Sequence, residues 1–291
     1  MALTAAVVVC SPLFAQQAPP AATPPAAVRS PYRNLAPGVV QSVDLERELD
    51  ESFSRHDVVE LLAFDPKFDW AKDVSFRHDV WALQFQFKPV RMLWVDVPQE
   101  SGQMRQKLIW YMVYSVTNTG KILHPLPDSD KPFEVQYVES PIRFIPQFLL
   151  EGRESLDATR SVAKVYPDRV IPIAIDPIRL REDPRRKFFN SAEISLGRLA
   201  VGKTAWGVAT WEDVDPKIDR FSIYVQGLTN AYKWTDEPAK YAQGAPLTTY
   251  RSFLQKTLKL NFWRPSDEYL EHEGEIRYGV PGEVDYEWVY R

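Results

Sequence analysis

Apolar and polar residues alternate with a period of two along much of the chain after residue 80. Between Trp81 and Phe87 every second residue is large and apolar, and the residues between them are small or polar. Residues 90–97 and 108–116 are two further apolar runs, separated by a polar turn at residues 100–103. Alternate side chains of a strand point to opposite faces of a sheet, so these segments predict half-buried strands.

The same signals recur through the rest of the chain. Pro172 lies inside the run at residues 171–175, and because proline donates no backbone hydrogen bond we expect an edge strand there. Residues 178–186 predict either a short helix or an irregular basic loop. The other expected strands cover residues 133–138, 143–150, 162–175, 192–196, 205–211, 221–228, 248–262, 275–278 and 284–290. Many short strands with few helices predict an all-β fold, either a sandwich or a barrel.

The N-terminus has the pattern of an export signal. Residues 3–9 are apolar and the small residue Ala15 follows, so we expect a signal peptide over residues 1–15 with cleavage after Ala15. Cys10 follows three valines and offers the alternative that the chain carries a lipid anchor at this residue. Both alternatives place the protein in the periplasm or outside the cell. The apolar run is too short to cross a membrane, which takes about 20 residues, and we expect no transmembrane segment.

Two segments separate this signal from the first strong strand. Residues 16–40 are rich in Ala and Pro and predict an extended linker. Residues 41–75 carry apolar residues at patchy helical spacing and predict a helical or irregular lead-in, with Asp57 capping a short helix that ends at Leu62. We therefore expect the β domain to cover residues 76–291.

The composition of the chain bears on its possible partners and on the interactions that stabilise the fold. The formal net charge is -4, so there is no general basic field, and we expect no nucleic acid partner. Cys10 is the only cysteine, so the chain forms no internal disulfide. An apolar core must therefore hold the fold.

Two short catalytic patterns occur, and neither has the context that its chemistry needs. Residues 197–204 fit the phosphate-binding loop formula, but the apolar run after them predicts a strand where phosphate binding requires a helix. Ser161 and Lys164 match the S-x-x-K pair of penicillin-recognising enzymes, but the S-D-N element is missing from the sequence. We therefore assign no catalytic residue and no nucleotide site.

An acidic loop near residues 212–219 is a candidate metal site. Asp213, Asp215 and Asp219 place carboxylates close together in sequence, and calcium prefers oxygen ligands. The EF-hand pattern fails, because Lys217 and Tyr224 stand where that loop needs oxygen ligands. The alternatives are a calcium loop and a solvated turn, and no other cofactor is indicated.

Aromatic residues near turns and strand ends form the other candidate site. Trp211, Trp234 and Trp263 are candidates for ligand binding, because exposed indole rings stack on sugars or anchor protein interfaces. The alternative is that most aromatic rings fill the core, as we expect for Trp81, Trp94 and Trp110.

Two resemblances bear on fold and function. Residues 108–120, an aromatic and aliphatic strand that ends in V-T-N-T-G, resemble the central strand of immunoglobulin-like bacterial β-sandwiches. Residues 206–232 and 260–278 resemble a family of uncharacterised exported proteins of planctomycete-type bacteria. The first resemblance implies an immunoglobulin-like β-sandwich. The second implies export and a single β-rich fold, and it brings no catalytic residue.

The leading functional hypothesis is a non-catalytic envelope or extracellular protein that acts by binding another protein. A carbohydrate-binding module is the first alternative, because of the aromatic residues, and a hydrolase with a spatially assembled pair of carboxylates is the second. Exposed coplanar Trp or Tyr rings would favour sugar binding, and a cleft with two close carboxylates would favour the enzyme. A broad apolar patch without a cleft would favour the interaction protein.

Overall fold

The computed structural model describes residues 39–43, 45–61, 75–126, 133–157, 160–215, 217–240, 242, 244–264 and 275–291. All of them belong to one compact unit, residues 31–291. The expected signal peptide, Cys10 and the linker up to residue 38 lie outside the described residues, and the expected domain boundaries stay predictions. Strands make up 49% of the structure and helices 13%, which confirms a mainly-β fold.

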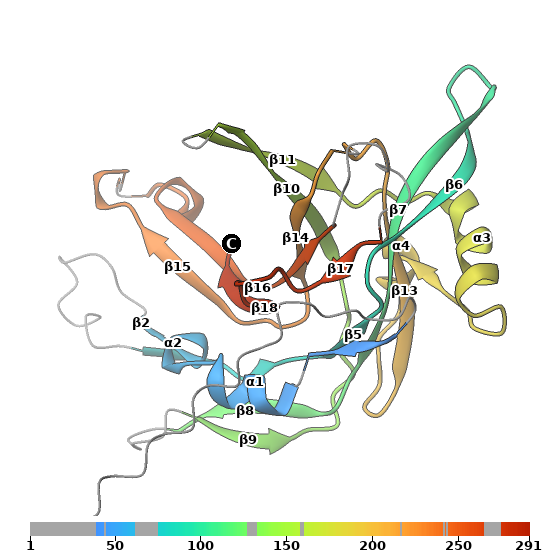
Figure 1. Cartoon of the computed structure of the whole chain (residues 1–291). Coiled ribbons are helices and arrows are strands. Elements are labelled where there is room, and N and C mark those ends of the chain that lie inside the picture. The colour runs from blue at the N-terminus through green and yellow to red at the C-terminus, as the bar shows by residue number, and fades with distance from the viewer. Residues whose placement is uncertain are drawn as a thin grey trace, which may run out of the picture. The chain divides into compact units, whose positions relative to one another are not determined.

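The first large sheet is built around one long strand, β7. Its strand order is β1-β5-β7-β13-β12, and β6 pairs with the first half of β7 (Figure 1). The bounds are β1 (Gln41–Ser42), β5 (Gln84–Phe87), β6 (Arg91–Pro98), β7 (Met104–Thr117), β12 (Phe189–Asn190) and β13 (Thr204–Trp211). The prediction of strands at residues 90–97, 108–116 and 205–211 is confirmed.

The second large sheet is built around β14 and β16. Its order is β11-β10-β14-β16-β15, and two short strands, β17 and β18, also pair with β16. The bounds are β10 (Gln147–Asp157), β11 (Arg160–Pro167), β14 (Arg220–Gln226), β15 (Tyr232–Asp236), β16 (Arg251–Trp263), β17 (Arg277–Tyr278) and β18 (Tyr286–Tyr290).

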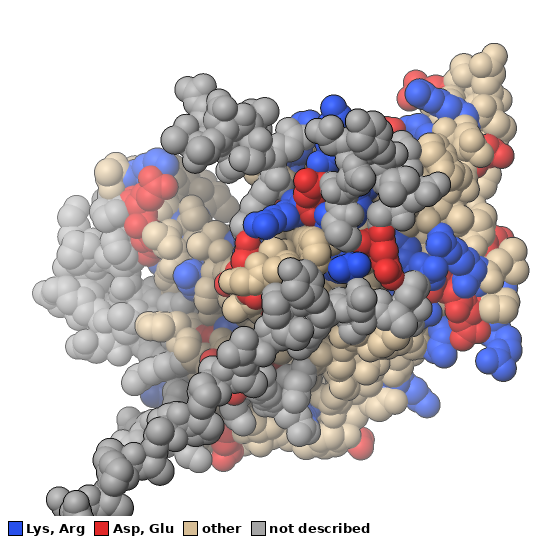
Figure 2. All heavy atoms as spheres, viewed as in Figure 1, with Lys and Arg blue, Asp and Glu red and all other residues tan. Residues whose placement is uncertain are grey.

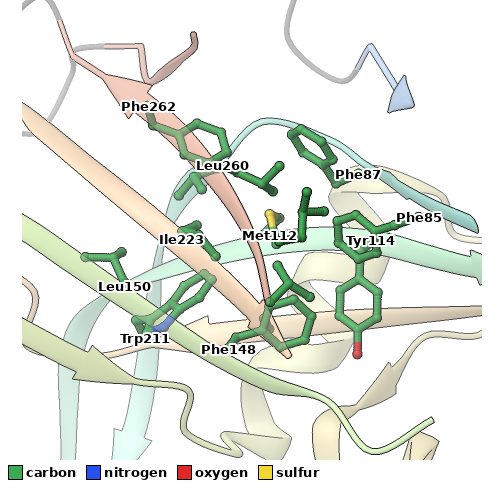
Figure 3. Close-up of a cluster of buried hydrophobic side chains, with 14 of the residues drawn as sticks. Phe85, Phe87, Met112, Tyr114, Phe148, Leu150, Trp211, Ile223, Leu260 and Phe262 are labelled. Carbon is green, nitrogen blue, oxygen red and sulfur yellow. The ribbon is translucent and has the colours of Figure 1, made fainter. Parts of the chain in front are cut away.

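The two large sheets pack face to face through the main apolar core. Figure 3 shows Phe85, Met112 and Tyr114 of the first sheet against Phe148 and Ile223 of the second. The other face of β7 is also covered, because Ile109, Tyr111 and Val113 pack against helix α3 (Pro172–Glu182). Burial on both faces explains why β7 is a continuous apolar run instead of an alternating one.

Two smaller sheets and several short helices complete the unit. The three-stranded sheet has the order β4-β8-β9, with bounds β4 (Val80–Trp81), β8 (Lys121–Pro125) and β9 (Phe133–Tyr137), and the two-stranded sheet pairs β2 (Val59–Leu61) with β3 (Ser75–Arg77). The short helices are α1 (Leu45–Glu51), α2 (Arg55–Val58), α4 (Ser191–Ile194), η2 (Pro238–Lys240) and η3 (Leu247–Thr249). None of the helices in the described part of the chain is long and apolar enough to cross a membrane.

The helical lead-in is attached to the second sheet by a buried ion pair. Lys256 of β16 lies 3.0 Å from an oxygen of Asp57, and the two side chains are 3% and 0% exposed. Burial lowers the pKa of Lys256, and the charge of Asp57 opposes that shift. Asp57, which lies in α2, also accepts a hydrogen bond from the backbone N–H of Ser54, the residue before this helix. The expected helix up to Leu62 is wrong, because the chain passes into β2 at Val59.

The expected edge strand at residues 171–175 is also wrong, because this segment starts helix α3. Pro172 stands in the first helical turn, where a missing backbone N–H costs nothing and the fixed φ angle favours the helix. Ile171, Ala174 and Ile178 recur at helical spacing and pack on β7. Of the two alternatives for residues 178–186, a short helix or an irregular loop, the structure has helix as far as Glu182.

Two other expectations fail for local reasons. Residues 192–196 contain the end of helix α4 instead of a strand, because Asn190 and Glu193 form a reciprocal capping box at its start. Trp94 is 51% exposed on β6 instead of buried, whereas Trp110 is 1% exposed, as expected. Strand β6 has only one neighbour among the described strands, so its outer positions are open.

Candidate functional site

A cleft of about 410 Å³ opens beside the second sheet, where β10 begins, β11 ends and α4 starts. We call it the sheet-edge cleft. Its apolar lining includes Pro146, Leu149, Pro167, Val170 and Ala192. Its polar lining consists of Gln147, Asp168, Ser191, Tyr224, Gln226 and Arg291. Concave, mostly apolar sites with a few convergent polar groups are where proteins usually bind ligands.

The period-two pattern of the strands places these side chains together. Gln147 pairs with Gln226 across β10 and β14, and Leu149 pairs with Tyr224 on the same face. The residue between them, Phe148, points into the core. The outer face of the sheet therefore presents two amides next to an apolar surface.

Asp168 fixes the wall of the cleft formed by α4. Its carboxylate accepts a hydrogen bond from the backbone N–H of Thr210 at 2.9 Å and another from the hydroxyl of Ser191. Burial raises the pKa of Asp168, and these two hydrogen bonds partly oppose that shift. The carboxylate thus joins the segment after β11 to both β13 and α4.

The described residues around Ser191 differ from the common hydrolase sites. An activated serine needs a base that can take its proton, most often a histidine, and a paired-acid hydrolase needs two carboxylates. Among the described lining residues, Asp168 is the one carboxylate and there is no histidine or lysine. The described lining of the cleft thus combines apolar surface with hydrogen-bonding groups.

The aromatic wall of the cleft is already covered. The guanidinium of Arg291 lies 4.1 Å from the centre of the Tyr224 ring and 2.8 Å from an oxygen of Glu151. A cation over an aromatic face is attracted by the ring's quadrupole. The guanidinium therefore covers one face of the Tyr224 ring.

The three tryptophans expected to bind a ligand differ in their burial and surroundings. Trp211 is 0% exposed in the main core, so its prediction as a ligand-binding residue is wrong: the strand position that holds it faces the second sheet. Trp234 and Trp263 are half-buried, with the guanidinium groups of Arg251 and Arg277 over their rings at 4.5 and 5.3 Å. Neither lines the sheet-edge cleft.

Trp234 belongs to an aromatic cluster that the sequence did not reveal. It pairs with Phe253 across β15 and β16, and Tyr232 lies on the same face. Phe253 is 51% exposed. The planes of Trp234 and Phe253 meet at 75°, and those of Tyr232 and Trp234 at 36°, so the rings are not coplanar. Period-two spacing along β16 was the signal that could have identified Phe253.

The three aspartates of the possible calcium loop are not brought together. An oxygen of Asp213 lies 2.9 Å from the ammonium of Lys107, and one of Asp215 lies 2.7 Å from that of Lys164. Within the described ranges, no group of three or more His, Cys, Asp or Glu side chains could hold a metal ion. The lysines come from β7 and β11, far away in sequence, which is why the linear pattern did not reveal this pairing.

Both catalytic patterns of the sequence have ordinary structural roles. Residues 197–204 lead into strand β13 instead of a helix, so the loop lacks the helix N-terminus that holds phosphate. Lys164 of the S-x-x-K pattern lies on β11 and pairs with Asp215.

Comparison of the chain with protein-family models, with curated proteins and with solved structures gives no match. The function must therefore be inferred from the geometry of the chain itself.

Proposed function

We propose that this is a non-catalytic exported protein that binds a short peptide segment of a partner protein in the sheet-edge cleft. The observation that carries the proposal is the lining of the cleft, where apolar walls surround the facing amides of Gln147 and Gln226. A peptide offers an apolar side chain for the walls and both N–H and C=O groups for the amides. Each primary amide can donate and accept hydrogen bonds, so the two chemistries match.

Charge supports the choice of an uncharged ligand segment. Arg291 is paired with Glu151, and Asp168 is engaged by Ser191 and Thr210. The charges of Arg291 and Asp168 are therefore both engaged by groups of the protein itself. On the face shown in Figure 2, basic and acidic side chains of the described residues are interspersed over and around α3.

Export remains part of the proposal and rests on the N-terminal sequence. The apolar run and Ala15 favour a signal peptide, so the partner would lie in the envelope or outside the cell. The immunoglobulin-like arrangement and the link to planctomycete-type proteins also remain proposals, and the two packed sheets are compatible with the former.

A random heptapeptide library displayed on phage tests the proposed function directly. The immobilised full chain should enrich peptides that share an apolar anchor residue. Ala192 is exposed and lines the cleft, so Ala192→Trp should fill the cleft and abolish the enrichment. Ala239, an exposed alanine in η2, provides the matched control, and Ala239→Trp should leave the enrichment unchanged.

Two outcomes would contradict the proposal. One is the absence of any shared sequence after repeated selection. The other is equal binding of the selected peptides to the wild type and to Ala192→Trp, because such peptides would bind elsewhere.

Glycan binding is a second candidate function, favoured by the exposed ring of Phe253 next to Trp234. The full chain would then sediment with insoluble polysaccharides, and Phe253→Ala would reduce this binding while Ala192→Trp would not. Absence of binding to any polysaccharide or to cell-wall material would remove this candidate.

A further inference from the structure

Strand β9 is an edge strand with an exposed apolar side. Among the described strands it pairs with β8 alone, through five residue pairs in continuous register, and Figure 1 shows it as the outermost strand of its small sheet. Val135 and Tyr137 are 47% and 63% exposed, and Val138, which follows the strand, is 38% exposed.

The edge strand β9 carries a single charged residue, Glu134, and lacks the stronger protections against pairing. Natural edge strands are guarded by lysine, proline or a bulge. The edge strands of the second sheet, β11 and β15, carry Lys164 and Lys233. Strand β9 has the sequence Phe-Glu-Val-Gln-Tyr and contains no lysine, no proline and no shift of register.

The backbone alternation shows which groups of β9 face outward. The N–H of Val138 donates to the carbonyl of Gly120, so the backbone N–H and C=O groups of even-numbered residues in β9 point toward β8. The N–H and C=O groups of Phe133, Val135 and Tyr137 then point away from β8. These three residues can exchange backbone hydrogen bonds with a further antiparallel strand.

The sequence of β9 is complementary to itself. Antiparallel pairing of two copies about Val135 places Phe133 opposite Tyr137 and Glu134 opposite Gln136. Aromatic residues then meet aromatic residues, and each carboxylate meets an amide instead of another carboxylate. Within one chain the amide of Gln136 already donates to Glu134 at 2.6 Å, so the two groups suit each other. Such cross-strand pairs stabilise antiparallel sheets.

The geometry points to a symmetric dimer of this chain formed by β9 pairing with β9 of a second copy. Pairing would join the two small sheets across a twofold axis at Val135 and cover Val135 and Tyr137. This interface is independent of the sheet-edge cleft, because no residue of β9 lines the cleft. One strand pair buries little area compared with stable complexes, so we expect weak, concentration-dependent association.

Sedimentation of the full chain, from micromolar to millimolar concentrations, tests this dimer. The wild type should change from monomer to dimer as the concentration rises. Val135→Pro removes an outward-facing N–H and should weaken association at least about tenfold. Val165→Pro is the matched control: Val165 is 46% exposed on edge strand β11, its N–H also points outward, and its replacement should have no effect.

Charged substitutions at Val135 distinguish specific strand pairing from non-specific association. Val135→Lys and Val135→Glu should each be monomeric, because like charges would meet at the twofold axis. An equimolar mixture should form the mixed dimer, since the lysine then faces the glutamate. The proposal is overturned if the wild type stays monomeric, if Val135→Pro and Val165→Pro act alike, or if the mixture stays monomeric.

Discussion

Gly207 shows how single residues set the packing of the main core. It lies on β13 opposite Tyr114, whose ring occupies the space that a Cβ atom would take. Tyr114 is fully buried and packs against Phe148 with ring centres 4.7 Å apart. A side chain at position 207 would therefore displace an aromatic ring from the interface between the two sheets.

We expect Gly207→Ala to lower the free energy of unfolding by about 1–3 kcal/mol, the usual cost of overpacking a core. The matched control is Gly197→Ala, because no atom lies within 4 Å of a Cβ built at Gly197. Urea unfolding of both variants measures the difference. Equal stability of the two variants would show that Tyr114 does not occupy this space.

Asp168 should give the stability a recognisable pH dependence. Its native pKa is raised above the ordinary value of 3.8, mainly by burial. Between 3.8 and the raised pKa the folded state binds more protons than the unfolded state, so wild-type stability falls as the pH rises through this window. Asp168→Asn removes this titration and can still accept the hydrogen bond from Thr210.

The stability of Asp168→Asn relative to the wild type should therefore increase from pH 4 to pH 7. The increase is about 1.4 kcal/mol for each unit by which the native pKa is raised. Urea unfolding at both values of pH measures it. A constant difference between the two proteins would mean that Asp168 is not desolvated, and the wall of the cleft would need another explanation.

At the scale of elements, helix α3 is held on β7 by a charged cluster as well as by apolar packing. The side chain of Glu182 is 1% exposed and lies 2.9 Å from Lys88, 2.7 Å from Arg91 and 2.7 Å from the hydroxyl of Tyr111. Burial alone would raise the pKa of Glu182. The hydrogen bonds from Lys88 and Tyr111 and the charge of Arg91 outweigh burial and hold this pKa below 4.5.

We expect Glu182→Gln to cost about 2–4 kcal/mol at neutral pH, since it leaves the partly buried charges of Lys88 and Arg91 without their partner. A depressed carboxyl pKa contributes stability above pH 4.5 that is lost as the pH falls through the native pKa. The difference between wild type and variant should therefore shrink in acid. Asp176→Asn, on the exposed side of the same helix, should cost less than about 1 kcal/mol. Equal costs for the two variants in thermal or urea unfolding would contradict this account.

The elements that could be predicted from the sequence are those that a local pattern of apolar and polar residues defines. Strands β7 and β13 could be predicted because their long apolar runs are typical of buried strands and not of loops. Polar residues marked the turn between β6 and β7. The first half of helix α3 and helix α4 were predicted as strands because β-branched isoleucine favours strands. Their helical state depends on Pro172 in the first turn and on the Asn190–Glu193 capping box.

At the scale of the whole molecule, the candidate site could not be predicted because it is assembled from distant segments. Gln147 and Gln226 meet through the register of β10 and β14, and Ser191 reaches Asp168 across 23 positions of the sequence. The burial of Trp211 could not be predicted for the same reason, since the sheet that covers it lies elsewhere in the chain. Two of the three carboxylates of the calcium hypothesis, those of Asp213 and Asp215, pair with lysines on other strands.

The central claim, that the sheet-edge cleft holds a peptide segment, is tested most directly by locating the bound peptide. A peptide selected from the phage library would carry a benzophenone group at its apolar anchor, be irradiated with the full chain, and be mapped by mass spectrometry. We expect the cross-links at Leu149, Val170 and Ala192, and their loss in Ala192→Trp. Cross-links at Phe253, at β9 or spread over the surface would contradict the claim.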